Sequence, residues 1–286
     1  MNGLTDSLTD RWNGMLPVNF HKTFIPERHL IAALLDYSAL GKSGSLHEIA
    51  AATGIPMGKT NGKVPAIIDY AIGMGLITLY PGGEKGVRIP QLTSFGKSVF
   101  LEDKFLGEEI TQWIAHMNLC RPDIGAKAWY KTFNEGRDII GGSFTFDQLE
   151  DYLVSIFRPG KDRTGPMLRA YWEDAALART KVIEKKGEVI SRTKAPLYDA
   201  FALSYSAYIL DLLETFFPNQ SQVTLSDFQG KTGWFNVCLW QENDIEKACS
   251  LMEETRHLSI DRQRRPWIIE KSRNAEEVWP CIWDDL

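Results

Sequence analysis

The chain has 286 residues with 44% hydrophobic and 24% charged side chains, so it can bury a sizeable core, and its net charge of -5 excludes a general attraction to nucleic acid. No stretch approaches the roughly 20 apolar residues of a membrane span, and the N-terminus carries acids where a signal peptide carries bases. The four cysteines form no Cys-x-x-Cys pair, which disfavours a zinc ribbon or a disulfide scaffold and leads us to expect a cytoplasmic protein.

The first ninety or so residues carry the signals of a winged helix-turn-helix. Ser45 and Glu48 match a capping box that begins a short helix, and Gly54 followed by Ile55 and Pro56 ends it. Three helices and a β-hairpin are predicted here, at residues 29–40, 45–54 and 59–75 and, for the hairpin, 76–92. This order is typical of bacterial DNA-binding regulators.

The rest of the chain predicts a larger helical region. Its helices are expected at residues 93–100, 105–119, 126–134, 144–157, 164–190, 196–217 and 243–256. HLSIDRQRRPWIIEKS alternates around two arginines and predicts a C-terminal β-hairpin, and the sequence shows no internal repeats. We therefore predict a mainly α (α+β) fold, in which an N-terminal segment and winged helix-turn-helix (1–98) packs on a helical domain (99–286).

DNA contacts are expected at the start of the third helix and at the wing. A helix N-terminus facing a major groove can offer backbone N–H groups to phosphate. The expected contact residues are Lys59, Asn61, Lys63 and Arg88. The overlapping word GIPMGKT is not a Walker loop, because three residues instead of four separate its glycines and a helix precedes it.

A second basic surface is expected between Arg158 and Lys194, where ten Lys/Arg face five Asp/Glu. The residues expected to lead this DNA or partner surface are Arg158, Lys161, Arg163 and Arg169. The alternative is a solvated helical face whose charges bind nothing.

Two clusters could carry chemistry. Glu108 and Glu109 lie with His116 on one predicted helix and Asp103 precedes that helix, so the acids could hold Mg²⁺ or Mn²⁺ and the histidine could act as a base. The alternative is that acids at a helix start complement the helix dipole. His21 and Arg28 form the second cluster, able to approach a phosphate or simply to pin the N-terminal segment onto the core.

Five short words resemble, in order, a bacterial family formerly of unknown function that is found in DNA phosphorothioation gene clusters. The words are FHKTFIPER (20–28), GIPMGK (54–59), LTSFGK (92–97), DKFLGEEITQWIAH (103–116) and AWYKTFN (128–134). The resemblance covers roughly residues 17–215. Gly107 stands where the family pattern has an acid, so a second carboxylate of a metal site would have to come from Glu109.

The resemblance implies a DNA nickase subunit that opens one strand for sulfur modification in phage defence. It implies Mg²⁺ as cofactor, with Asp103 and Glu108 as ligands. The implied partners are DNA, a cysteine desulfurase, an ATPase and an ATP-pyrophosphatase-like sulfurtransferase. Two other hypotheses stay open: a non-catalytic DNA-binding adaptor or regulator, and a scaffold whose winged helix binds only protein.

Overall fold

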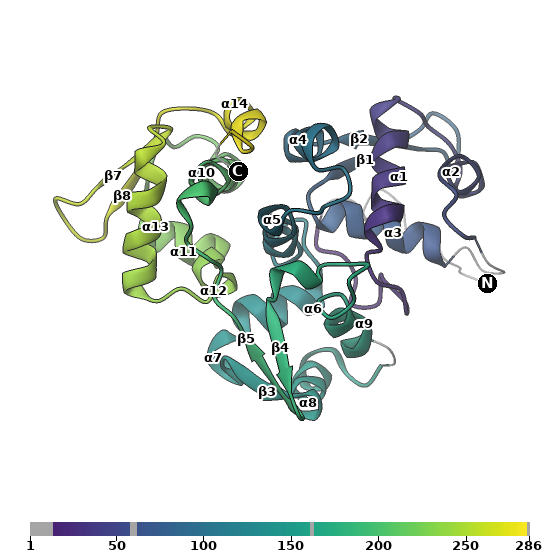
Figure 1. The fold of residues 1–286 in the computed structure, drawn as a ribbon, viewed down its shortest axis with the longest axis horizontal. Coiled ribbons are helices and arrows are strands. Elements are labelled where there is room, and N and C mark those ends of the chain that lie inside the picture. The colour runs from purple at the N-terminus through teal and green to yellow at the C-terminus, as the bar shows by residue number, and fades with distance from the viewer. Residues whose placement is uncertain (1–13, 58–61, 161–162, 285–286) are drawn as a thin grey trace, which may run out of the picture.

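A computed structural model describes residues 14–57, 62–160 and 163–284 of the chain. Helices dominate it, and its strands form small antiparallel sheets, as predicted for a mainly α (α+β) protein (Figure 1). None of the helices in these ranges is long and apolar enough to cross a membrane.

The first unit, residues 28–92, contains the predicted three helices and hairpin. Its elements are α1 (Arg28–Ala39), α2 (Leu46–Thr53), α3 (Lys63–Gly73), β1 (Ile77–Pro81) and β2 (Arg88–Leu92). The capping box of Ser45 and Glu48 is present, and Gly54 ends α2 in the left-handed conformation (φ 72°), which glycine adopts without strain. Gly44 pairs with Arg88 through the backbone, so a third short strand segment flanks the hairpin.

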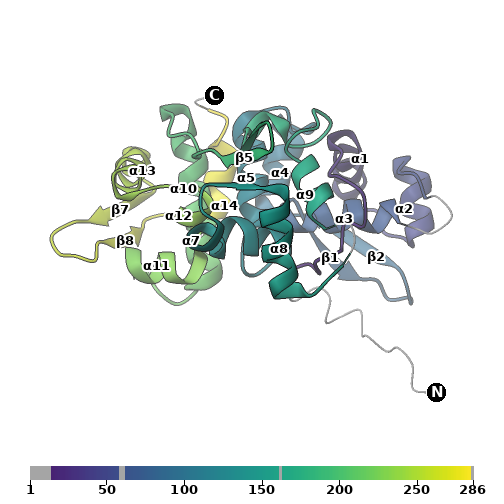
Figure 2. The ribbon, with the colours of Figure 1, turned by 90° about the horizontal axis from the view of Figure 1, so that it is seen from below.

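Helix α3 is packed on nearly all sides. Its buried residues are Val64, Ala66, Ile67, Ile68, Tyr70, Ala71 and Gly73. It contacts α1, α2 and the helix α5 (Glu109–Leu119), which follows α4 (Ser94–Glu102). Ten of the eleven residues of α5 are buried, because α5 runs through the centre of the molecule, between the first unit and the C-terminal elements (Figures 1 and 2).

Two further units follow. The second, residues 127–192, contains α6 (Lys127–Trp129), a π-helical stretch (Tyr130–Glu135), α7 (Arg137–Ile140), β3 (Ser143–Thr145), α8 (Phe146–Phe157), α9 (Thr164–Arg169), β4 (Ile183–Lys186) and β5 (Val189–Arg192). The third, residues 202–271, contains α10 (Ala202–Phe216), β6 (Gln222–Thr224), α11 (Leu225–Thr232), α12 (Trp234–Val237), α13 (Glu242–Glu254), β7 (Leu258–Asp261) and β8 (Ile268–Lys271), and α14 (Ala275–Val278) closes the chain.

The three units share one topology, so the expectation of no internal repeat is wrong at this level. In the second and third units the sheet orders are β3-β5-β4 and β6-β8-β7, with the first strand paired to the last. In the first unit the Gly44–Arg88 bridge takes the place of that pairing. A hydroxyl residue caps the helix after the first strand in each unit: Ser45, Thr145 and Thr224. The repeat lies in caps and pairing, not in shared sequence words.

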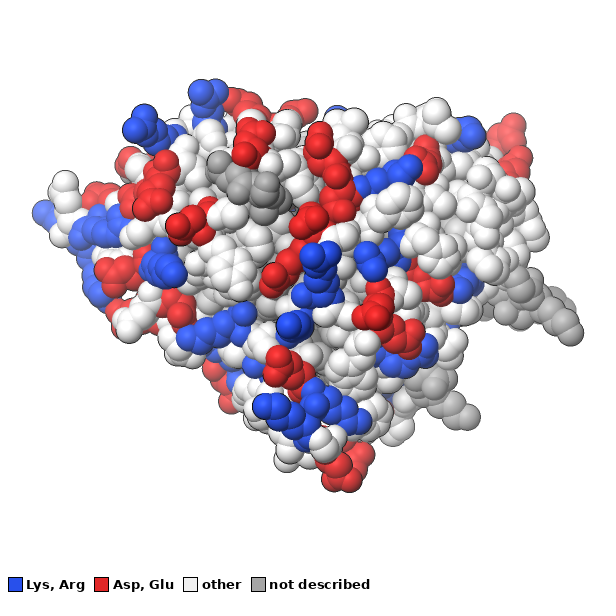
Figure 3. All heavy atoms as spheres, in the orientation of Figure 1, with Lys and Arg blue, Asp and Glu red and all other residues white. Residues whose placement is uncertain are grey.

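The helix expected over 164–190 is also corrected, because α9 ends at Arg169 and the hairpin β4–β5 occupies 183–192. Ile183 and Ile190 turn into the core while residues 184–189 stay exposed, and Gly187 (φ 62°) makes the turn. The run of charges predicted a helical face, but it belongs to an exposed hairpin. Charges of both signs are interspersed over the face in Figure 3, which fits the small net charge.

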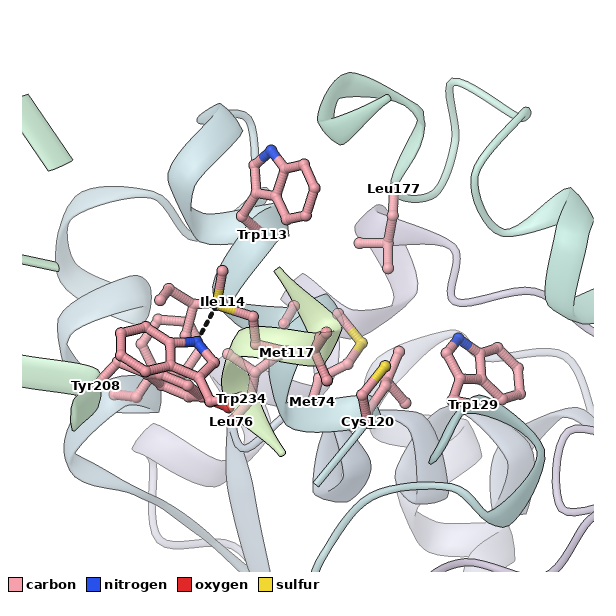
Figure 4. Packing of buried hydrophobic residues seen from close by; sticks show 14 of the residues in the cluster. Met74, Leu76, Trp113, Ile114, Met117, Cys120, Trp129, Leu177, Tyr208 and Trp234 are labelled. Atoms are coloured by element: carbon pink, nitrogen blue, oxygen red, sulfur yellow. Dashed lines mark hydrogen bonds between the residues drawn. The ribbon is translucent and has the colours of Figure 1, made fainter. Parts of the chain in front are cut away.

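One hydrophobic core runs through all three units. Figure 4 shows its middle, where Trp234 of the third unit donates its indole N–H to the sulfur of Met117 in α5 (3.3 Å). Arg192 is buried and donates to the carbonyls of Phe133 and Asn236 (both 2.9 Å), which joins the second unit to the third, and burial lowers its pKa to about 10. The boundary expected between residues 98 and 99 lies inside α4.

Candidate functional site

The loop between α4 and α5 holds the acids singled out in the sequence. The Asp103 carboxylate accepts backbone N–H groups of Gly107 (2.6 Å) and Glu108 (2.9 Å). Leu106 anchors the loop in the core with a positive φ of 50°. Glu108 is the exposed N-cap residue of α5 and Glu109 lies in its first turn, where the helix dipole favours acids. A backbone hydrogen bond therefore joins Asp103 to Glu108 across the loop, and Glu109 follows as the first residue of α5.

Arg28 reaches this loop from the start of α1. Its guanidinium donates to the carbonyls of Phe105 (3.2 Å) and Leu106 (3.3 Å) on one side and of Asp174 (2.7 Å) on the other. None of these partners carries a charge on the accepting atom, so the guanidinium charge is not neutralised by a carboxylate within the described ranges. The sequence placed Arg28 near a phosphate only by proximity to His21.

Arg179 is a site residue that the sequence did not reveal. Its guanidinium donates to the carbonyl of Gly107 (2.7 Å), and its backbone N–H donates to the side chain of Gln112 (3.1 Å), which itself donates to Leu106 (2.7 Å). A surface pocket of about 250 Å³ lies between the two arginines, lined by Arg28, Gly107, Gln112, Asp174, Ala178 and Arg179. Two guanidinium groups at one pocket suit a phosphate, which arginine binds through paired N–H groups.

The comparisons with known proteins bear on the fold. No protein-family model and no curated protein matches the chain. Two solved structures do, a magnesium ion-bound SspB crystal structure and an SspB crystal structure, each with a TM-score of 0.69 and 15% identity, covering 93% of this chain and 86% of the other. This chain has an SspB-like fold.

The two histidines lie inside this SspB-like fold and away from its surface. His116 is fully buried with Nδ1 2.6 Å from the hydroxyl of Tyr171, which also accepts the indole N–H of Trp129 (2.8 Å). Burial, with a smaller effect of Arg192, holds the pKa of His116 well below its usual range, so the ring is neutral at pH 7. His21 is equally buried and packs edge-on against Trp129. The His116 ring contacts Tyr171, Trp113 and Phe133.

Of the residues expected to bind DNA, the structure describes Lys63, Arg88, Arg158, Arg163 and Arg169. Lys59, Asn61 and Lys161 lie outside the described ranges. Lys63 pairs with Glu27 (2.6 Å), and Arg88 donates to the carbonyl of Gly86 (3.0 Å). In the 158–194 segment, Arg158 is exposed and Arg169 pairs with Glu173 (2.5 Å).

The expectation that Arg163 helps to lead a basic surface is wrong, because only 2% of this residue is exposed. Its guanidinium donates to the carbonyls of Arg158 (2.7 Å) and Gly160 (3.2 Å), so it closes the turn between α8 and α9 and cannot lead a surface. Among the described residues of this segment, the exposed cations are Arg158, Arg169, Arg179, Lys181, Lys185, Lys186 and Lys194.

A magnesium site on the acidic loop would depend on few protein ligands. In the part of the chain that the structure describes, no group of three or more His, Cys, Asp or Glu is placed to hold a metal ion. Mg²⁺ commonly takes one or two carboxylates and fills its octahedron with waters and substrate phosphate oxygens. Asp103 fits that pattern as one carboxylate ligand, since each of its oxygens accepts one N–H and keeps a lone pair free.

Proposed function

We propose that this chain is a DNA-binding, Mg²⁺-dependent nicking component of a bacterial DNA phosphorothioation system. The observation that carries the proposal is that the guanidinium groups of Arg28 and Arg179 both donate to carbonyls of the acidic loop 103–109. The two arginines and Gly107 of this loop line one exposed pocket. The SspB-like fold supports it, and so does the resemblance of five sequence words to the phosphorothioation family. The partners implied are the desulfurase, ATPase and sulfurtransferase of the same system.

The roles of the residues follow from their chemistry. Arg28 and Arg179 would bind the non-bridging oxygens of the scissile phosphate, and their fixed backbone contacts hold them ready for the charge that develops in the transition state. Asp103 and Glu108, on the loop, and Glu109, at the start of α5, are the acids from which one or two carboxylates would hold Mg²⁺. The bound ion would neutralise phosphate charge and lower the pKa of a water molecule. An acidic residue then has to accept the proton, because both histidines are buried.

A non-catalytic DNA-binding adaptor is the second candidate. Two observations favour it: the burial of His116 and His21, and the few protein ligands available to a metal. In this case the arginine pocket would hold a phosphate without cleaving it.

The proposal is tested by nicking of supercoiled plasmid in Mg²⁺ or Mn²⁺. We expect the Glu108→Gln, Glu109→Gln double variant to nick at least about 100-fold more slowly, the scale of a lost catalytic acid or base. Its melting temperature should stay within a few degrees, since surface substitutions change stability by about 0.5 kcal/mol or less. Glu102→Gln, an exposed acid at the end of α4, is the matched control and should nick normally.

Full nicking by the double variant would remove the acidic loop from the chemistry. If the wild-type chain binds duplex DNA but nicks it with neither metal, the adaptor is the better description.

A further inference from the structure

Phe105 is the most exposed aromatic side chain of the described residues, with 58% of its surface accessible. It lies in the acidic loop, two residues after Asp103 and three before Glu108. An exposed phenylalanine leaves a large apolar surface in water, and exposed apolar groups next to a polar site often mark contact with a partner.

The backbone under Phe105 is held from several sides. Arg28 binds the carbonyl of Phe105 itself and that of Leu106, and Asp103 binds the N–H groups of the two residues after Leu106. Leu106 is fully buried. The backbone that carries the ring is therefore held in place, so the ring can insert into a binding partner without displacing the loop.

One cation lies at the ring, and two more contact the backbone of the loop that carries it. The ammonium group of Lys104 lies 5.4 Å from the Phe105 ring centroid and pairs with Asp36 (3.0 Å). Arg28 donates to the carbonyl of Phe105, and Arg179 donates to that of Gly107. An apolar ring on a loop that two guanidinium groups contact fits a polyanion with a stacked apolar interior, which describes duplex DNA better than an apolar protein surface.

Resting on the proposed function, we propose that Phe105 is a wedge that enters between two base pairs next to the scissile phosphate. Apolar side chains that enter a base step unstack it, at a cost of a few kcal/mol, and kink the duplex by roughly 20–90°. Phe105 is a positioning residue. The kink would turn a phosphate of the strand to be cut toward Arg28 and the carboxylates of Asp103 and Glu108, while the other strand stays outside the site.

The competing interpretation is a protein-docking patch. Leu40, which directly follows α1, is 68% exposed, and Leu101 in α4 is 73% exposed. Helices α1 and α4 pack on each other. A docking patch would use the leucines and Phe105 alike, whereas a wedge uses the ring alone. Leu101→Ala is therefore the matched control for Phe105→Ala.

The test measures bending and nicking together. End-to-end energy transfer in a labelled duplex of about 30 base pairs reports the bend, and plasmid nicking reports the rate. We expect Phe105→Ala to bind DNA within about threefold of wild type, to leave it straight and to nick at least about tenfold more slowly, a change of about 1.4 kcal/mol. Phe105→Trp and Leu101→Ala should bend and nick as wild type does.

A second substrate separates the wedge from a folding defect. A plasmid carrying a one-nucleotide bulge at many sites already has open steps, so it should restore nicking by Phe105→Ala to near the wild-type rate. No such rescue, or straight DNA in the wild-type complex, would overturn the wedge while leaving the nicking proposal intact. Equal losses for Phe105→Ala and Leu101→Ala would instead show a docking patch. A wild-type chain that binds no DNA would overturn both proposals.

Discussion

The first and third units share a topology but use the helix that precedes the hairpin in opposite ways. Helix α3 is buried between α1, α2 and α5, so it serves as part of the central core. Helix α13 lies at the edge of the molecule (Figures 1 and 2), with its apolar residues turned inward. It contains five acids, Glu242, Asp244, Glu246, Glu253 and Glu254, against Lys247 alone.

Helix α3 has no exposed residue between Lys63 and Gly73, and the exposed face of α13 is mainly acidic, whereas a helix in a major groove presents donors to bases and phosphates. The expected contacts Lys59 and Asn61 lie outside the described residues. The same strand and helix order therefore serves as a core element in one unit and as an acidic outer layer in the other. The order of elements determines the fold, whereas the side chains on its surface determine any binding. For this reason the proposed DNA contacts lie in the α4–α5 loop and the second unit's hairpin.

The largest expected effect is on stability. It compares Gly96 in α4, which packs tightly against the first unit, with Gly230 in the third unit, which has open space beside it. A Cβ on Gly96 in α4 would lie 1.8 Å from the carbonyl oxygen of Leu76, whereas a Cβ on Gly230 in α11 meets nothing within 4 Å. We expect Gly96→Ala to destabilise the chain by about 3 kcal/mol or more, because backbone has to move. Gly230→Ala should be neutral or stabilise it by about 0.5–1 kcal/mol.

Urea unfolding of both variants measures this difference. Equal midpoints for the two alanine variants would mean that α4 can shift away from the first unit's hairpin.

The second effect concerns pH and compares His116 in α5 with His257 near the third unit's hairpin. Burial lowers the pKa of both, and that of His116 far more. Below the usual histidine pKa of 6.5, the unfolded chain binds a proton that the folded chain does not, so stability is complete above that pH and falls as pH drops. The loss from His116 should approach about 1.4 kcal/mol per pH unit.

Unfolding free energies at several pH values between about 7 and 5 measure this slope. His116→Gln should be less stable at pH 7, through its lost contact with Tyr171, but should flatten the slope more than His257→Gln does. A steeper slope for His116→Gln than for the wild type would show that His116 is protonated in the fold.

The smallest expected effect is on the salt dependence of DNA binding, and it compares the hairpins of the second and third units. Lys185→Ala with Lys186→Ala, on the exposed hairpin of the second unit, should reduce the salt dependence of DNA binding by about two units of slope. Arg264→Ala with Arg265→Ala, at the tip of the third unit's hairpin, removes the same charge and should change it by less than about one unit. The acids of α13 lie beside that tip, where Glu242 pairs with Arg265 (2.6 Å), and repel DNA.

Salt titrations of duplex binding compare the two double variants. If the arginine pair lowers the slope as much as the lysine pair, the third unit binds DNA as well.

Features that depend on near neighbours can be predicted from the residues alone. The capping box of Ser45 and Glu48, the helical spacing over 29–40 and the alternation on both sides of the C-terminal turn are all present, and they were enough for the fold class. The acids of the α4–α5 loop could also be found, because three of them lie within seven residues. Caps and periodicity act over three or four residues, so they are legible in the chain.

The tertiary structure alone decided which charged and titratable residues face solvent. His116 and Arg163 look polar in sequence, yet packing buries both, and the hydrogen bonds that make this tolerable come from Tyr171 and from nearby carbonyls. Arg28 and Arg179 contact the same loop although 151 positions separate them in the sequence. Contacts between distant residues depend on how the helices pack as a whole, and no local spacing in the sequence records that packing.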